Sequence, residues 1–363
     1  MIISKRKLKR YAEANFENVP LELVHNFLYL GININSNGSF TQCKEILTKK
    51  AQKSINKLKG LLCGMTVKKS VALKLFDQLV LPILTYGAEI WAPLDMKNLL
   101  VKGNTCIEEL YSKLPQEKLN IQFCKFILGV SSRSSNLAAM GELGRYPLYV
   151  YILPRVIKYY SRITEIQDNS LLKDAFSEMI KADETNSRKS VTWFKIMKHI
   201  INSIKVNNCK DKKVVKQELQ KRYRTFWENL IQNQSGKLDT FKEIKQDFMY
   251  EKYLDFGAKQ HQTELTKLRI SNHKLNIETG RYKKPFIPRE NRLCDMCNDR
   301  VEDEAHFMFE CPSLKEIRKN SFGSEFIGGD KYQTLRAYIG DFTKSDPISV
   351  GKYIKRAMEK RDS

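Results

Sequence analysis

The sequence predicts a mainly α-helical protein with a short β-hairpin near its N-terminus and a small metal-stapled lobe near its C-terminus. Three observations predict this. From residue 41 onward, apolar residues recur at helical spacing over much of the chain. Before that, "NFLYLGININSNGSF" joins a short apolar and aromatic run to alternating isoleucines and an Asn-Gly turn pair. Near the other end, three cysteines and one histidine fall within 18 residues.

The charge balance favours a polyanionic partner. The chain holds 63 Lys and Arg against 41 Asp and Glu, a formal net charge of +22. A field of that size attracts nucleic acid, and basic solvated faces without such a partner are the alternative. The start "MIISKRKLKR" has no apolar signal core, and the uncharged stretch from Gln78 to Ala88 is far shorter than the roughly 20 residues of a membrane span. We therefore expect a nuclear or cytoplasmic protein that is neither secreted nor membrane-bound.

The first long helix is predicted to be amphipathic. Ser39 and Gln42 resemble a capping box that opens it. Its apolar residues recur on one face, at Leu47, Ala51, Ile55, Leu58 and Leu62. Its lysines populate the other faces, at Lys44, Lys49, Lys50, Lys53, Lys57 and Lys59. Because gripping a nucleic-acid backbone needs positive charge and shape, these lysines are the expected nucleic-acid contacts.

Further helices follow along the chain. One is expected from about residue 68 to 81, broken by Pro82, and another from 117 to 128, stopped by Gly129. Two more are expected in "NLAAMGELG" and in "PLYVYILPRVIKYYSRI", the latter beginning at Pro147. Polar helices are predicted from about 161 to 249, with a loop at "SGKLDT". A mixed segment then leads into the cysteine cluster.

The cluster "LCDMCNDRVEDEAHFMFECP" has the spacing C-x2-C-x8-H-x4-C. Its predicted metal ligands are Cys294, Cys297, His306 and Cys311. Three thiolates and an imidazole suit Zn²⁺, and a closed set of four ligands indicates a structural metal. The alternative is a core histidine beside reduced thiols. We expect Glu302, Asp303 and Glu304 to be solvated charges rather than ligands, and the other cysteines to be ordinary buried thiols.

Several blocks, read in order, resemble the C-terminal part of non-LTR (LINE-type, jockey-like) retrotransposon reverse transcriptases. "FLYLGI" is similar to their primer-grip motif, and "LVLPILTYGAEIW" is similar to the helix after their thumb. "FCKFILGV", "AAMGELGRYPL" and "LRISNHKLNIETGRY" resemble later blocks, and the Cys-Cys-His-Cys cluster resembles their cysteine-rich end. These landmarks cover most of the chain.

The resemblance implies roles for particular segments. A primer-grip-like hairpin would hold the primer 3′ end through Phe27, Leu28, Tyr29, Leu30 and Gly31, although Phe27 and Tyr29 as plain half-buried strand residues are the alternative. The implied domains are a palm remnant at 1–40, a thumb-like helical domain at 41–105, a helical connection at 106–260 and the zinc-stapled lobe at 261–363.

The sequence lacks the catalytic motifs of the family that it resembles. Polymerisation needs paired Asp carboxylates that hold metal ions, but the sequence has no Asp-Asp pair, and none of the 26 residues before Phe27 is Asp. The sequence contains no recognisable nuclease motif either. We therefore expect a non-enzymatic chain that binds RNA or an RNA–DNA duplex, with its palm supplied by another chain, encoded upstream or lost. The alternative is a decayed or co-opted structural remnant that binds another protein.

Overall fold

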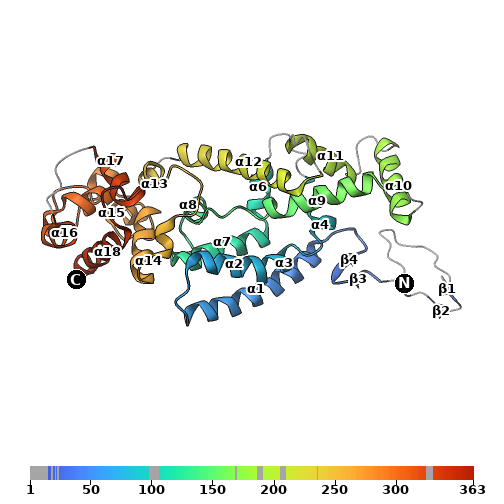
Figure 1. Ribbon diagram of the computed structural model, residues 1–363, viewed down its shortest axis with the longest axis horizontal. Helices are drawn as coiled ribbons and strands as arrows, with labels where there is room; N and C mark the ends of the chain where they lie inside the picture. The colour runs from blue at the N-terminus through green and yellow to red at the C-terminus, as the bar shows by residue number, and fades with distance from the viewer. Residues whose placement is uncertain are drawn as a thin grey trace. The chain divides into compact units, whose positions relative to one another are not determined.

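Helices form most of the computed structural model, as the sequence predicts (Figure 1). It describes residues 15–17, 19–20, 22, 24–97, 106–167, 170–185, 191–204, 210–234, 236–323 and 330–363. Much of the start of the expected 1–40 domain, the expected boundary at 105 and Ser235 of the expected "SGKLDT" loop lie outside these residues.

The chain divides into two compact units. Unit 1 holds residues 1–60, 75–119 and 147–220, and unit 2 holds 61–74, 120–146 and 221–363. Each unit is thus assembled from separate stretches of chain, whereas the sequence predicts consecutive domains. The functional division into remnant palm, thumb and connection stays a prediction.

The described helices are assigned to the units as follows. Within unit 1 lie α3 (Leu81–Leu84), α4 (Ala88–Asp95), α6 (Ile107–Ser112), α9 (Tyr149–Thr164), α10 (Leu171–Thr185) and α11 (Trp193–Ile204). Within unit 2 lie α8 (Asn136–Glu142), α13 (Asp239–Ile244), α14 (Lys259–Arg269), α15 (Asn276–Thr279), α16 (Lys315–Phe322), α17 (Lys331–Leu335) and α18 (Pro347–Asp362). Residues of both units occur in α1 (Thr41–Cys63), α2 (Lys69–Leu79), α7 (Pro115–Leu128) and α12 (Lys212–Gln232). Short 3₁₀ or π segments of unit 2 are η1 (Lys252–Asp255), η2 (Arg289–Asn291), η3 (His306–Glu310), η4 (Pro312–Leu314) and η5 (Arg336–Gly340).

The predicted N-terminal hairpin is present. Strands β3 (Asn26–Tyr29) and β4 (Ile32–Asn35) pair antiparallel, with Phe27 opposite Ile34, and a shorter pair, β1 (Asn15–Phe16) and β2 (Val19–Pro20), precedes them. The hairpin turn is Leu30-Gly31, with both residues at positive φ (46° and 81°), as in the two-residue turns that match strand twist. The Asn-Gly pair of the sequence lies instead in the turn between β4 and α1.

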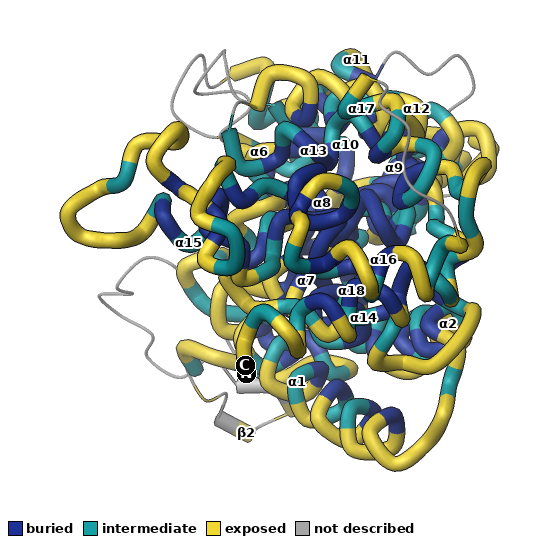
Figure 2. The backbone as a smooth tube through the Cα atoms, turned by 90° about the vertical axis from the view of Figure 1, so that its left-hand side faces the viewer, coloured by how far each residue is buried: buried dark blue, intermediate teal, exposed yellow. Residues whose placement is uncertain are grey.

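Helix α1 has the predicted amphipathic build. All five apolar residues expected on its inner face are buried, and along α1 in Figure 2 buried and exposed stretches alternate. The start differs from the expected capping box: α1 begins at Thr41, and Ser39 Oγ accepts a hydrogen bond from the Thr41 backbone N–H at 3.2 Å. The helix therefore begins two residues after the serine.

The core of unit 1 forms around Trp91 of α4, which packs against α9. The indole Nε1 donates to the Tyr86 carbonyl at 2.9 Å, so the ring is buried with its polar atom satisfied. Pro82 ends the preceding helix as predicted, since α2 stops at Leu79 and α3 begins at Leu81. Pro147 is two residues too early as a predicted helix start, because α9 begins at Tyr149.

The core of unit 2 contains Trp227 and a buried charge network. Trp227 Nε1 donates to the Leu137 carbonyl at 2.9 Å, and its ring lies so close to Gly141 that a Cβ there would sit 2.5 Å from it. The Arg269 guanidinium is fully buried and binds the Glu142 carboxylate through Nε (3.0 Å) and Nη2 (2.9 Å). Nη1 also donates to the carbonyls of Ile339 and Gly340. A buried charge with this many partners ties α8, α14 and η5 together.

The cysteines outside the cluster differ in their burial. Cys43 and Cys124 are buried thiols as predicted, whereas Cys63 is exposed, Cys106 is half-buried and Cys209 lies outside the described residues.

Among the described helices, none combines the length and the apolar character that crossing a bilayer requires.

Candidate functional site

The first two cysteines of the cluster lie on a tight knuckle. An antiparallel bridge joins Leu293 to Val301, and the Cys294 N–H donates to the Arg300 carbonyl at 2.8 Å. The Asn298 N–H donates back to the Cys294 carbonyl at 2.8 Å, and Asn298 has φ of 54°. Asparagine tolerates this left-handed backbone better than most residues. The turn therefore brings two side chains three positions apart to the same side.

The other two side chains come from a π-helical turn, η3. The His306 N–H donates to Asp303 Oδ1 at 2.9 Å, which caps the turn, and the Cys311 N–H donates to the His306 carbonyl at 2.8 Å. The two bonded residues are five positions apart, which is the hydrogen-bond spacing of a π-helix. Single π-helical turns of this kind often occur at functional sites. It places His306 and Cys311 beside each other, facing the knuckle.

The four predicted ligands converge. Their ligand atoms, from Cys294, Cys297, His306 and Cys311, all lie within 4.8 Å of one another. Cys294 Sγ is 3.9 Å from Cys311 Sγ, and Cys297 Sγ is 3.4 Å from His306 Nε2. A tetrahedral ion with metal–sulfur bonds of about 2.3 Å needs sulfur atoms about 3.8 Å apart. The spacing thus fits a closed four-ligand metal site, and the cysteines are free of disulfides.

The protonation states of the group are compatible with a bound cation. Burial raises the pKa of the Cys294 thiol to about 12, and the neighbouring Cys311 adds to the rise. Burial also acts on Cys297, but backbone N–H groups of Asp299 and Arg300 hold the pKa of that thiol below its usual range. Burial lowers the pKa of His306 and so keeps the imidazole in the neutral form that binds metals. Without an ion the Cys294 thiol stays protonated, and a bound cation would favour its thiolate form.

A second layer surrounds the histidine. His306 Nδ1 lies 3.7 Å from Glu310 Oε2, and Arg300 Nη1 lies 3.3 Å from the same oxygen. A carboxylate beside Nδ1 favours the tautomer with the proton on that nitrogen, which leaves Nε2 free as a ligand atom. Nε2 is the atom that faces Cys297.

The acidic loop between the ligands corrects one expectation. Glu302 and Glu304 are buried rather than solvated. Glu302 binds Arg361 of α18 (Nη2 to Oε2, 2.8 Å) and accepts from the Asn276 N–H at 2.6 Å. Glu304 accepts from Thr240 Oγ1 at 3.0 Å and lies 3.0 Å from the His273 ring nitrogen, and Asp303 pairs with Lys331. These carboxylates pair with other side chains and bind the lobe to the helices around it.

Buried side chains also support the π turn from α16 and α18. Arg318 donates to the carbonyls of Met308 and Cys311, each at 2.9 Å. The Tyr353 hydroxyl donates to the Phe307 carbonyl at 2.8 Å. The backbone that carries two ligands is therefore held at its carbonyl groups, which sequence patterns alone do not reveal.

The primer-grip-like hairpin exposes its tip. Leu28, Tyr29 and Leu30 are exposed, and Phe27 is half-buried. These residues are available to a partner. Exposed apolar side chains at a hairpin tip are unusual unless something contacts them.

The hairpin turn is fastened to the second sequence block, "LTYGAEIW". The Tyr86 hydroxyl donates to the Leu30 carbonyl at 2.7 Å, and a Cβ on Gly31 would lie 3.2 Å from the Tyr86 ring. A Cβ on Gly87 would lie 2.2 Å from Ile32 Cδ1. Two blocks that are more than fifty residues apart thus form one local structure, a contact that sequence reasoning did not foresee.

The lysines of α1 separate into two groups. Lys49, Lys50, Lys53 and Lys57 are exposed, and at 3.6 residues per turn they fall within an arc of about 100°. We call these four residues the lysine face. Lys44 instead pairs with Asp95, and Lys59 is half-buried. The ion pair neutralises Lys44, so only part of the predicted set presents free charge.

Comparisons with family models, with curated proteins and with solved structures found no match to this chain. A function is therefore inferred from the sequence motifs and from the geometry of the sites.

Proposed function

We propose that this chain binds RNA or an RNA–DNA duplex through the lysine face of α1, as the C-terminal part of a non-LTR-type reverse transcriptase. The observation that carries the proposal is the lysine face itself. Four ammonium groups lie on one side of one helix, opposite its buried apolar residues. From Lys49 to Lys57 they cover about 12 Å of helix axis, which allows contacts to several successive phosphates.

The remaining features support the same role. The net charge of +22 adds a long-range attraction to any nucleic acid. The exposed hairpin tip is fixed to the LTYG block through Tyr86, as a segment that positions a strand end must be. We propose no chemical step for the chain, because its sequence holds no Asp-Asp pair.

We further propose that the Cys-Cys-His-Cys group binds Zn²⁺ as a structural ion. Cys294, Cys297, His306 and Cys311 would complete its coordination, which leaves no open position for a substrate. The role of the ion is to hold the knuckle against the π turn.

A charge-matched pair of variants tests the nucleic-acid proposal. In the first variant the lysine face is changed to glutamine at all four positions. In the control, four exposed lysines elsewhere in unit 1 are changed in the same way, at Lys195, Lys198, Lys212 and Lys213. Both variants lose the same net charge, so a general field effect weakens both equally.

Fluorescence anisotropy with a labelled RNA–DNA hybrid measures the outcome. We expect the lysine-face variant to lose at least about tenfold more affinity than the control, since each charged contact contributes about 1.5–3 kcal/mol at most and less when exposed. Equal losses would overturn the assignment to α1. No binding by the unaltered chain would favour the alternative, a remnant that binds protein.

A further inference from the structure

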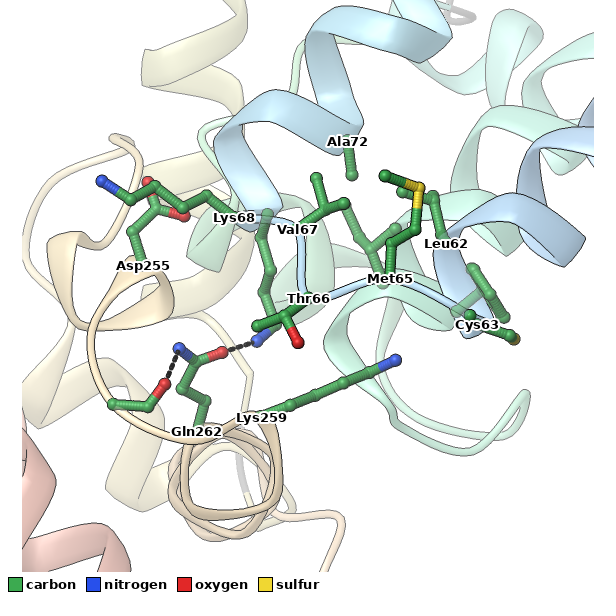
Figure 3. A pocket seen from close by; sticks show the side chains of 15 residues that line it. Leu62, Cys63, Met65, Thr66, Val67, Lys68, Ala72, Asp255, Lys259 and Gln262 are labelled. Carbon is green, nitrogen blue, oxygen red and sulfur yellow. Dashed lines mark hydrogen bonds between the residues drawn. The ribbon is translucent and has the colours of Figure 1, made fainter.

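A cavity of about 450 Å³ lies within unit 2, outside the sites described above (Figure 3). It is bordered by the loop after α1, by the start of α2 and by the start of α14. One part of its lining is charged, with three lysines (Lys68, Lys69 and Lys259) against one acid (Asp255), which leaves two positive charges in excess. The other part is apolar and consists of Leu62, Met65, Val67, Ala72, Phe126 and Ile127.

Lys69 is a buried ammonium group in the wall of this cavity. Lys69 is only 5% exposed, and its amine donates to Gln262 Oε1. The Gln262 side chain is fixed in that orientation, because its Nε2 donates to the carbonyls of Phe256 (2.9 Å) and Gly257 (3.1 Å). An ammonium group has three donors, and within the described residues Gln262 is the one acceptor that Lys69 reaches. Two donors of a buried charge are left for a ligand.

The positions of the lysines also favour an anion. Lys69 is the first residue of α2 and Lys259 is the first residue of α14, so two helix N-termini meet at the cavity. The N-terminal end of a helix carries partial positive charge, which disfavours a lysine and favours a bound anion. Lys259 is exposed, extends into the cavity in Figure 3, and has no carboxylate partner among the described residues.

Asp255 offsets only part of this charge. Its Oδ1 accepts from the Ser70 backbone N–H at 3.2 Å and from the Tyr250 hydroxyl at 2.8 Å, so it caps α2 instead of pairing with an amine. Burial lowers the pKa of Lys69 to about 8, with Asp255 opposing the change and Lys259 adding to it. The amine is therefore held in a place where its charge is costly unless an anion compensates it.

We infer that this cavity binds a phosphate ester of about nucleotide size, with its phosphate between Lys69 and Lys259 and its organic part against the apolar wall. A phosphate offers the several acceptor oxygens that the free donors need. The volume lies in the range of sites for small organic ligands. The phosphate can come from a free nucleotide or from the 5′ end of a strand. The inference stands without the proposed grip by α1, which involves other residues.

Calorimetric titration of the full chain tests the inference. The probes are AMP, adenosine, and a short RNA oligonucleotide with either a 5′-phosphate or a 5′-hydroxyl end. Where a phosphorylated probe binds, we expect its affinity to be at least about tenfold higher than that of its unphosphorylated counterpart. The reason is that a charged hydrogen bond contributes about 1.5–3 kcal/mol. Binding of AMP identifies free nucleotides as the source, and binding of the phosphorylated oligonucleotide alone identifies strand ends.

Variants locate the site. Lys69→Met and, separately, the exposed Lys259→Met should each weaken phosphate-dependent binding about tenfold or more, whereas Lys344→Met, an exposed lysine of unit 2 outside the cavity, should leave it unchanged. The phosphate preference should persist when the lysine face of α1 is changed to glutamine, which separates this site from the proposed function. Equal affinity for phosphorylated and unphosphorylated probes, or wild-type binding by both cavity variants, would overturn the inference.

Discussion

Removal of the proposed Zn²⁺ should unfold the knuckle of the cysteine lobe, residues 294–301, while the rest of unit 2 stays folded. Without an ion, the knuckle is held by few backbone bonds, namely Cys294 N–H to Arg300 O, Asn298 N–H to Cys294 O and Glu302 N–H to Arg292 O. At about 1 kcal/mol each they contribute about 3 kcal/mol. Structural Zn²⁺ in small domains contributes about 10–16 kcal/mol. A bound Zn²⁺ would therefore supply most of the stability of the knuckle, whereas the π turn is also held by Arg318 and Tyr353. The buried network of Arg269 and Glu142 does not depend on the ion.

Hydrogen exchange measured by mass spectrometry, with and without a chelator under reducing conditions, checks this. We expect the amides of Cys294 and Asn298 to lose protection, and those of α8 and α14 to keep it. Cys294→Ser should act like the chelator, while Cys63→Ser, an exposed cysteine outside the cluster, should retain both metal and protection. Purified protein that contains no stoichiometric metal, or a knuckle that stays protected after the metal is removed, would refute the reasoning.

Three further substitutions give predictions for urea denaturation. Arg269→Met should lower the free energy of unfolding by about 3–5 kcal/mol, because it leaves the buried Glu142 carboxylate without its positively charged partner; adding Glu142→Leu should restore most of the loss. Gly87→Ala should cost about 1–3 kcal/mol from its left-handed backbone alone (φ 62°), and more because its Cβ would meet Ile32. Lys69→Met should stabilise the protein at pH 7 by up to about 3 kcal/mol, since the pKa of Lys69 falls from 10.5 to about 8 on folding. The folded state then binds fewer protons than the unfolded state between these values, so wild-type stability should rise across that pH window and the advantage of Met should vanish above it; a constant difference from pH 7 to 11 would contradict this.

The helices and the convergence of the four cluster residues could be predicted because local patterns determine them. The apolar spacing of α1, the break at Pro82 and the stop at Gly129, which has φ of 71°, all depend on neighbouring residues. The ligand spacing likewise fits a knuckle and a turn that are built within 18 residues.

The features that sequence reasoning missed depend on contacts between distant residues. The Leu30-Gly31 turn carries no usual turn pair, and the Tyr86 hydroxyl that binds it lies 56 residues away. Glu302 looked solvated because its partner Arg361 is 59 residues away. In the same way Asp95 neutralises Lys44, and Gln262 orients Lys69 from 193 residues away. Residue type and spacing do not reveal such partners.

The salt dependence of hybrid binding tests the central claim most directly. Each phosphate contact adds about −0.9 to the slope of log affinity against log salt concentration on duplex DNA. Changing Lys49, Lys50, Lys53 and Lys57 to glutamine should therefore make the slope of the RNA–DNA hybrid shallower by up to about 3.6, while the control change in unit 1 should alter it far less. An identical slope for the unaltered chain and the lysine-face variant would contradict the claim that α1 grips the phosphate backbone.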